Sequence, residues 1–214
     1  NALSSLSATE LRASLNTASY NIAIGNNSQT SSSKAYDNIS IGHDAMRNSG
    51  GWLLHNIAIG TEALKGVQGY HSDWVWASGN NNIAIGYQSG LYTGTGGGGG
   101  AYNVYYGVKS GQAIIFGNSN TMIGNEANAS SDVSNATALG NGALVGASNT
   151  IQLGNTSITN VKTSGTITAG AVTYPKTDGT NGQFLQTNGS GTLLWASAGG
   201  VTSISGGSTG LTPS

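Results

Sequence analysis

The sequence NIAIG at residues 21–25 returns as NISIG at 38–42 and recurs unchanged at 56–60 and 82–86. Looser copies follow: NVYYG at 103–107, NTMIG at 120–124, NATALG at 135–140 and NTIQLG at 149–154. The closing glycines are 14 residues apart at the closest, from Gly140 to Gly154, and 26 apart at the widest, from Gly60 to Gly86. A short unit repeated in this way predicts an architecture of stacked, similar coils.

Each clean copy places two isoleucines two residues apart, which is the period of a β-strand and puts both on one face. The closing glycine suits a turn, because glycine adopts positive φ without steric cost. A small residue lies between the isoleucines and points to the other face, where it permits close approach: Ala23, Ser40, Ala58 and Ala84. We expect the isoleucines to form the core of the repeat: Ile22, Ile24, Ile39, Ile41, Ile57, Ile59, Ile83 and Ile85.

One copy holds about two brief strands and two turns, which is too little to bury its own isoleucines. Stacked copies can bury them, with like residues on like at the strand spacing of about 4.8 Å. The sequence therefore predicts an all-β fold, a parallel β-solenoid.

These residues resemble the head domains of trimeric autotransporter adhesins and related modules of bacteriophage tail fibres. The family repeat reads approximately Asn-x-Ala-Ile-Gly-x-x-Ala and implies a left-handed parallel β-roll that forms a homotrimer. The resemblance covers residues 21–154 and departs from the family in irregular spacing and in tyrosine for isoleucine at Tyr105 and Tyr106. The trailing small residue of the family motif is present at Ala45, Ala63, Ser89, Ser110, Ala127 and Ala143.

The flanks differ from the repeats. Residues 155–214 alternate apolar and polar residues between glycines, and the stretch 178–214 resembles segments of phage tail-fibre shafts. In residues 1–20, Ser7 and Glu10 form a capping box, which predicts a helix from about Ala8 to Asn16. We expect a helical connector at 1–20, the roll at 21–154 and a β shaft or linker at 155–214. The chain starts without methionine and stops within a pattern, so it is expected to be a piece of a longer polypeptide.

Composition disfavours several classes of protein. Only 7% of residues are charged and the net charge is −1, so neither a nucleic-acid surface nor a basic membrane-facing helix is expected. The chain has no cysteine, which excludes disulfides and thiolate metal sites. The apolar runs are far shorter than the roughly 20 residues of a membrane span, so we predict no membrane insertion.

Catalytic chemistry finds little support in the sequence. The glycine run at 94–100 lacks the Gly-Lys-Ser/Thr ending of a phosphate loop, and the histidines lack metal-ligand spacing. Asp44 and Glu62 hold equivalent repeat positions, but so do Arg47 and Lys65, which would lower both carboxyl pKa values, whereas a glycosidase needs one raised. A surface ion-pair cluster explains the four residues better. We predict no enzyme activity, no cofactor and no metal.

The surplus residues in the wider gaps predict loops that leave the stack, and such insertions often gather on one binding face. Two of them, residues 50–56 and 69–80, are rich in aromatic residues, which are favoured in binding hot spots. The same side chains could instead fold over the roll or seal the cleft between neighbouring chains. The candidate receptor-binding residues are Trp52, His55, Tyr70, His71, Asp73, Trp74 and Trp76.

Together the patterns and resemblances imply a structural and receptor-binding segment of a trimeric bacteriophage tail fibre, located in the virion. Its expected partners are two copies of itself, other tail proteins and a host-surface glycan or envelope protein. One alternative is the head of a bacterial trimeric autotransporter adhesin on the cell surface. Two others are less well supported: a polysaccharide depolymerase would need clustered carboxylates, and an ice-binding solenoid would need ladders of Thr-x-Thr.

Overall fold

The computed structural model describes residues 20–30, 34–47, 52–67, 79–95 and 99–197. Within these ranges the protein consists of strands, turns and bends, and contains no helix. The helix predicted near Ala8 to Asn16 lies outside them. The chain divides into two units, residues 1–159 and 160–214, which are described separately below.

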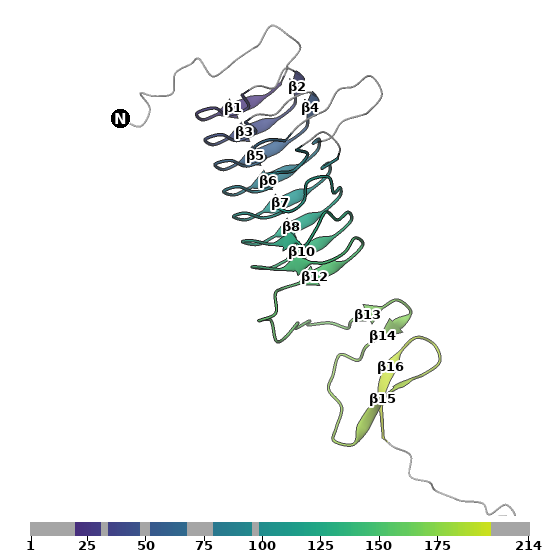
Figure 1. Cartoon of the computed structure of the whole chain (residues 1–214). Coiled ribbons are helices and arrows are strands. Elements are labelled where there is room, and N and C mark those ends of the chain that lie inside the picture. The colour runs from purple at the N-terminus through teal and green to yellow at the C-terminus, as the bar shows by residue number, and fades with distance from the viewer. Residues whose placement is uncertain (1–19, 31–33, 48–51, 68–78, 96–98, 198–214) are drawn as a thin grey trace, which may run out of the picture. The chain divides into compact units, whose positions relative to one another are not determined.

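Eight repeat copies supply the eight strands of one parallel sheet (Figure 1). The strands follow one another in chain order and pair in register, so that Ile22, Ile39 and Ile57 lie side by side. This is the predicted parallel β-solenoid. The strands are β1 (Ile22–Ile24), β3 (Ile39–Ile41), β5 (Ile57–Ile59), β6 (Ile83–Ile85), β7 (Val104–Tyr106), β8 (Thr121–Ile123), β10 (Thr137–Leu139) and β12 (Ile151–Leu153).

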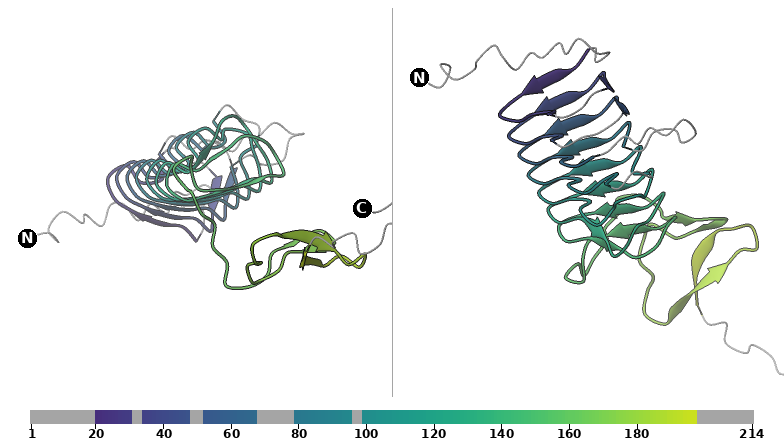
Figure 2. Two further views of the ribbon diagram at one scale, coloured as in Figure 1. Left: turned by 90° about the horizontal axis from the view of Figure 1, so that it is seen from below. Right: turned by 45° about the horizontal axis from the view of Figure 1, so that its top comes forward.

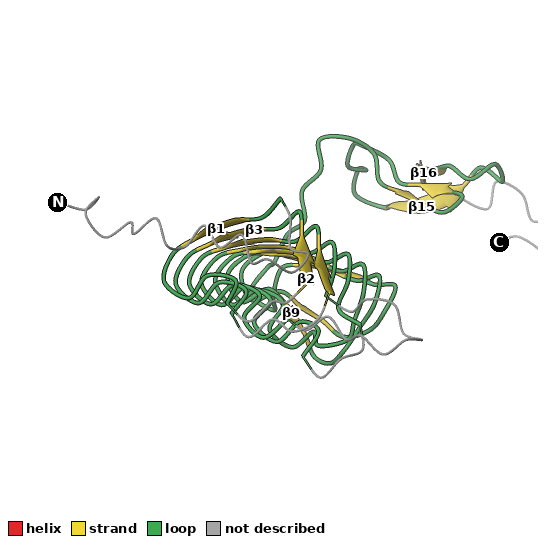
Figure 3. Cartoon of the chain, turned by 90° about the horizontal axis from the view of Figure 1, so that it is seen from above, coloured by secondary structure: helices red, strands yellow, loops and turns green. Residues whose placement is uncertain are grey.

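Shorter strands continue the coils on another side of the stack. β2 (Lys34–Tyr36) pairs with β4 (Trp52–Leu54), and β9 (Asn128–Ala129) pairs with β11 (Leu144–Val145), both in parallel. Figures 2 and 3 show the coils stacked along one direction, with the long sheet on one wall and turns closing the rest.

The interior of the roll differs from our prediction. The residue between the two isoleucines faces inward: Ser40, Ala58 and Ala84 have no exposed surface. The isoleucines point outward instead, and Ile22, Ile24 and Ile83 are 48%, 46% and 37% exposed. The predicted core is therefore wrong for the single chain. The other five isoleucines are half-buried: Ile39, Ile41, Ile57, Ile59 and Ile85.

The width of the coil explains this inversion. The inward residue of each strand faces the trailing small residue of the repeat: the Ser28 hydroxyl, for example, donates to the Ser40 carbonyl at 2.9 Å. Two walls this close leave no room for isoleucine between them, and the larger inward residues, Tyr105 and Met122, lie further along the stack. Larger side chains fill the rest of the interior, and those without exposed surface include Met46, Leu53, Leu64, Val67, Ile114 and Val145.

The repeated asparagine is a structural device. The Asn38 side-chain oxygen accepts a hydrogen bond from the backbone N–H of Asn56, and the Asn56 oxygen accepts one from Asn82, each at 2.9 Å. Most of these amides also donate to a carbonyl in a neighbouring turn, as Asn82 does to Gly100. The ladder so formed pairs backbone groups that would otherwise be buried unsatisfied. It runs through Asn21, Asn38, Asn56, Asn82, Asn103 and Asn120, and ends on the N–H of Ala136.

The closing glycines stack equally closely. Gly107 has φ +137°, and a Cβ added to it would lie 2.3 Å from the carbonyl oxygen of Gly124 in the next coil. Both the backbone conformation and the contact therefore require glycine. The same clash would occur at Gly25, Gly42, Gly60, Gly86 and Gly124.

The fifth copy of the repeat differs from our prediction that Tyr105 takes the place of an isoleucine. Tyr105 pairs with Ala84 and Met122, so it occupies the inward position rather than an isoleucine position, and it is fully buried. Gly90 and Gly111 leave room for its ring: a Cβ added to Gly90 would lie 2.6 Å from the ring, and a Cβ added to Gly111 would lie 2.2 Å from it. A large residue on one wall is thus matched by glycines on the other, which maintains the coil width.

The C-terminal unit is built differently. β13 (Thr168–Ala169) pairs antiparallel with β14 (Val172–Thr173), and β15 (Gln183–Thr187) with β16 (Leu193–Ser197). The Trp195 ring contacts Gly179, and its indole N–H donates to the Thr177 carbonyl at 2.8 Å. None of residues 155–197 is buried.

Candidate interaction surfaces

The outward face of the eight-stranded sheet is the most extended apolar surface that the described residues form. It consists of two columns of side chains, and by the strand spacing the sheet is about 34 Å long. Monomeric proteins rarely expose continuous apolar patches of this extent, and such patches mark interaction sites. The column nearer the closing glycine is apolar throughout: Ile24, Ile41, Ile59, Ile85, Tyr106, Ile123, Leu139 and Leu153.

The second column of this face is more mixed. It begins with four isoleucines and Val104, then changes to Thr121 and Thr137 before ending with Ile151. Ile151 is 69% exposed, as expected for the last strand of the sheet. The two columns therefore differ in polarity towards the C-terminal end of the roll.

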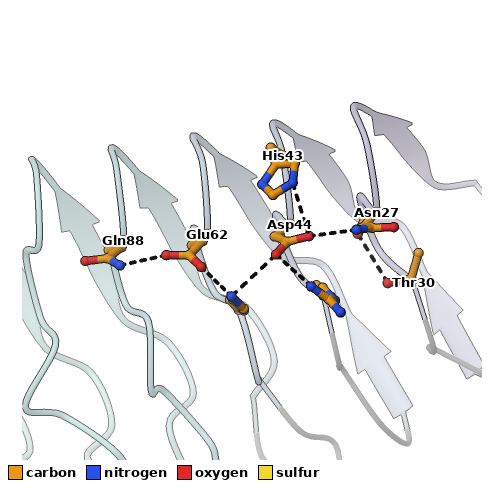
Figure 4. Close-up of polar contacts among 8 residues, drawn as sticks. Asn27, Thr30, His43, Asp44, Glu62 and Gln88 are labelled. Atoms are coloured by element: carbon orange, nitrogen blue, oxygen red, sulfur yellow. Dashed lines mark hydrogen bonds and ion pairs between the residues drawn. The ribbon is translucent and has the colours of Figure 1, made fainter.

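A polar cluster lies on the turns that follow the closing glycines (Figure 4). The Asp44 side chain is 4% exposed; it accepts from Arg47 at 2.9 Å and Asn27 at 3.0 Å, and it lies 3.4 Å from the Lys65 ammonium. Lys65 also pairs with Glu62, which accepts from Gln88 at 2.6 Å. The predicted equivalence of the two acid and two base positions thus produces an ion-pair network across successive coils.

Both carboxylates of this cluster have lowered pKa values. For Asp44, burial is the largest influence and opposes ionisation, but hydrogen bonds from Arg47 and Asn27 and the charges of Arg47 and His43 together hold its pKa at about 2. The hydrogen bond from Lys65 is the main cause of the lowered pKa of Glu62. Neither group has the raised pKa of a glycosidase general acid, so this cluster is suited to holding coils together.

A separate corner of the coil carries a column of mostly exposed residues, each two positions before a strand of the long sheet. His55, Asn81 and Tyr102 all have φ near +60°, and the backbone N–H of each bonds to the coil before it. The His55 ring lies 3.5 Å from the Asp37 carboxylate, and both side chains are about half exposed. The full column is Tyr20, Asp37, His55, Asn81, Tyr102, Ser119, Asn135 and Asn149.

The predicted receptor-binding residues are only partly described. Trp52 belongs to β4, and its neighbour Leu53 is fully buried, so residues 52–54 form part of the coil wall and not a loop that leaves the stack. This part of the loop prediction is wrong. His55 lies exposed on the corner column. The remaining candidates lie outside the described residues: Tyr70, His71, Asp73, Trp74 and Trp76.

Sequence reasoning did not identify the corner column or the apolar face as surfaces. The corner column could have been found from the sequence, since a polar or aromatic residue precedes the repeat asparagine in most copies.

No cluster of three or more histidine or acidic residues that could hold a metal ion occurs in the described ranges. A helix that could span a membrane is likewise not found among them.

No protein-family model, curated protein or solved structure matches the chain. The function is therefore inferred from the surfaces described above and from their chemistry.

Proposed function

We propose that the chain is a structural and receptor-binding segment of a bacteriophage tail fibre, in which three copies of a left-handed roll associate in parallel. The observation that carries the proposal is the apolar outward face of the eight-stranded sheet. A face that presents equivalent positions on every coil, most of them apolar, can be buried continuously by identical copies in the same register. The three-fold count and the virion location follow from the resemblance of the repeats.

The polarity of the two columns suggests how the copies meet. The column that includes Ile59 and Tyr106 is apolar on all eight strands, which suits the water-free axis of a trimer. The column that includes Thr121 and Thr137 contains hydroxyls, which suit the more peripheral contact with a neighbouring chain. Like residues would then face one another across the axis.

The C-terminal unit supports assembly independently. A two-stranded hairpin is marginally stable on its own in water. Phe184, Leu185 and Leu194 of the β15–β16 hairpin are each at least 40% exposed. Copies of this unit wrapped around one another would bury these side chains and form the shaft that the sequence resembles.

Single cysteines provide a direct test, because the chain contains none of its own. Ile59→Cys places a thiol in the apolar column, whereas Ser131→Cys places one on an exposed turn as a control. Under mild oxidation we expect covalent dimers from Ile59→Cys only, since at most two of three thiols can join. Sedimentation equilibrium of the unmodified chain is expected to give three times the mass of 21.4 kDa. A folded monomer at micromolar concentration would contradict the proposal.

Attachment is tested separately from assembly. Fluorescently labelled trimer is expected to bind the surface of at least one strain in a panel of Gram-negative and Gram-positive bacteria. Binding is expected to remain when the cells are killed gently, because attachment requires no metabolism. If the trimer binds none of the strains, the receptor-binding part of the proposal fails while the structural part stands.

A further inference from the structure

A solvent-open hollow of about 550 Å³ lies on the corner column where three successive coils meet. This volume falls in the range of small-ligand sites. Three asparagines, a tyrosine and a serine supply its polar surface, and none of the described side chains that line it is charged. The lining residues are Asn80, Asn81, Gly99, Ala101, Tyr102, Asn118 and Ser119.

Two of the amides are fixed in orientation and still have unused donors. The Asn80 oxygen accepts from the Leu54 N–H at 2.9 Å, and the Asn118 oxygen accepts from the Ala101 N–H at 2.8 Å. Those bonds settle which end of each amide is oxygen, because a backbone N–H can only donate. Within the described residues, the side-chain nitrogen of neither asparagine has a hydrogen-bond partner.

Asn80 is the more informative of the two. Its residue is only 4% exposed, and its side-chain NH₂, which donates to no described residue, is reached by solvent in the hollow that Asn80 lines. The donor is therefore held in place by the bond to Leu54 and is open to a ligand. A ligand with hydroxyl or carbonyl oxygens in the hollow would supply the missing acceptor.

Tyr102 adds an aromatic surface beside these donors. It is 63% exposed, and its backbone is held by a hydrogen bond from its N–H to the Asn80 carbonyl at 3.0 Å. The negative face of an aromatic ring attracts weakly positive C–H groups, such as those on one face of a pyranose ring. The Asn81 and Ser119 side chains offer further neutral donors and acceptors at the same corner.

We infer that this hollow binds a neutral saccharide, with a pyranose ring on Tyr102 and its hydroxyls on the amides of Asn80 and Asn118. The absence of charge in the lining disfavours phosphate, sulfate and acidic sugars, which need a cation, and metal ions, which need carboxylates. The inference names a ligand class for the receptor-binding role proposed above and rests on that role only for the biological source of the glycan.

The test uses three neutral probes, maltotriose, chitotriose and lactose, with sialyllactose as the charged comparison. Saturation-transfer NMR on the full chain is expected to show contact with at least one neutral probe. Asn80→Asp is the decisive variant, because it keeps an oxygen that accepts from Leu54 and replaces the NH₂ donor with a charged acceptor oxygen; Asn135→Asp controls for the added charge. Tyr102→Asn removes the ring and retains a residue type that tolerates positive φ.

We expect each variant to weaken binding at least tenfold, with unchanged mass and melting temperature. Asn135→Asp makes the same chemical change on the corner column outside the hollow, and it is expected to bind as the unmodified chain does. Contact with sialyllactose alone, contact with none of the probes, or full binding by Asn80→Asp would overturn the inference.

The failures of the two proposals are distinguishable. If labelled chain binds bacteria and Asn80→Asp binds them equally, the hollow is not the receptor site but the fibre role stands. If a neutral probe binds in the hollow and no bacterial strain is bound, the saccharide inference stands and the receptor-binding role fails.

Discussion

The roll and the C-terminal unit use similar residues with opposite results. In the roll, residues from 35 to 145 contribute side chains with no exposed surface, whereas none of residues 155–197 is buried. Both regions are rich in glycine and small polar residues, and both alternate apolar with polar residues. The difference is register: the roll pairs each residue with its equivalent in the next coil, while the C-terminal unit pairs short antiparallel strands without a second layer.

This comparison teaches that repetition, and not hydrophobicity, gives the roll its core. Alanine, serine and glycine bury little surface each, but their columns recur on every coil and bring backbones close together. The C-terminal unit has larger apolar residues, such as Phe184 and Trp195, yet its described residues form no layer that covers them.

Gly107→Ala is expected to be the most damaging single change, and it disrupts the stacking that sets the roll apart. The added Cβ would lie 2.3 Å from a backbone oxygen, at a φ that only glycine adopts readily. We expect a loss of at least about 4 kcal/mol of unfolding free energy, measured by urea denaturation. The control is Gly165→Ala in the C-terminal unit, where nothing lies within 4 Å and the change should be near neutral.

Tyr105→Ala is expected to cost about 3–5 kcal/mol, because it empties the position of a fully buried aromatic ring between Gly90 and Gly111. The neighbouring Tyr106→Ala, on the outward face, serves as the matched control, since that side chain is 57% exposed. Thermal and urea unfolding of the two variants decide the matter. Equal losses that do not vary with protein concentration would contradict the assignment of inward and outward faces, because a loss at the proposed trimer axis would vary with concentration.

Asn82→Ala is expected to cost about 1–3 kcal/mol, because it leaves the Asn103 N–H and the Gly100 carbonyl without their partner. Asn141→Ala, at an exposed turn, removes an amide that makes only a surface hydrogen bond and should be nearly neutral. Hydrogen exchange adds a local readout: the Asn103 amide should lose protection in Asn82→Ala. Unchanged protection there would show that the ladder contributes little.

The Asp44 cluster predicts a pH dependence. A carboxyl whose folded pKa is depressed to about 2 contributes stability that is present above its unfolded pKa of about 3.9 and is lost as pH falls through 2. We expect the melting temperature to fall between about pH 4 and pH 2. Asp44→Asn should flatten part of this decline. A decline of the same slope in the variant would assign the effect to other carboxyls.

Ile59→Ala is expected to have the smallest effect within one chain. Ile59 is half-buried on the outward face, so truncation should cost about 1 kcal/mol, below the 2–5 kcal/mol of a fully buried isoleucine. In the proposed trimer the same change should also lower the melting temperature more at low protein concentration. A loss of several kcal/mol of unfolding free energy that does not vary with protein concentration would show that the isoleucines lie in the interior.

The sequence predicted the solenoid because the repeat encodes it locally. Two apolar residues at period two, a closing glycine and a spacing of 14 or more residues define strand, turn and coil, and eight copies identify the strands that pair. The ion-pair cluster was also predictable, since equivalent positions of stacked repeats lie side by side. Of the candidate receptor residues, only Trp52 and His55 lie within the described residues, and the hollow on the corner column was not anticipated.

The sequence by itself thus determined the strands, their order and their register. Tertiary structure alone decided which face of each strand is inside. Period-two alternation is symmetric between the two faces, and hydrophobicity favoured the isoleucines, but the coil is too narrow to hold them. Its width is set by the small residues that face one another across the coil, as with Ser28 and Ser40, and by the glycines that face Tyr105. That distance is a property of the closed coil and of no single segment of the chain.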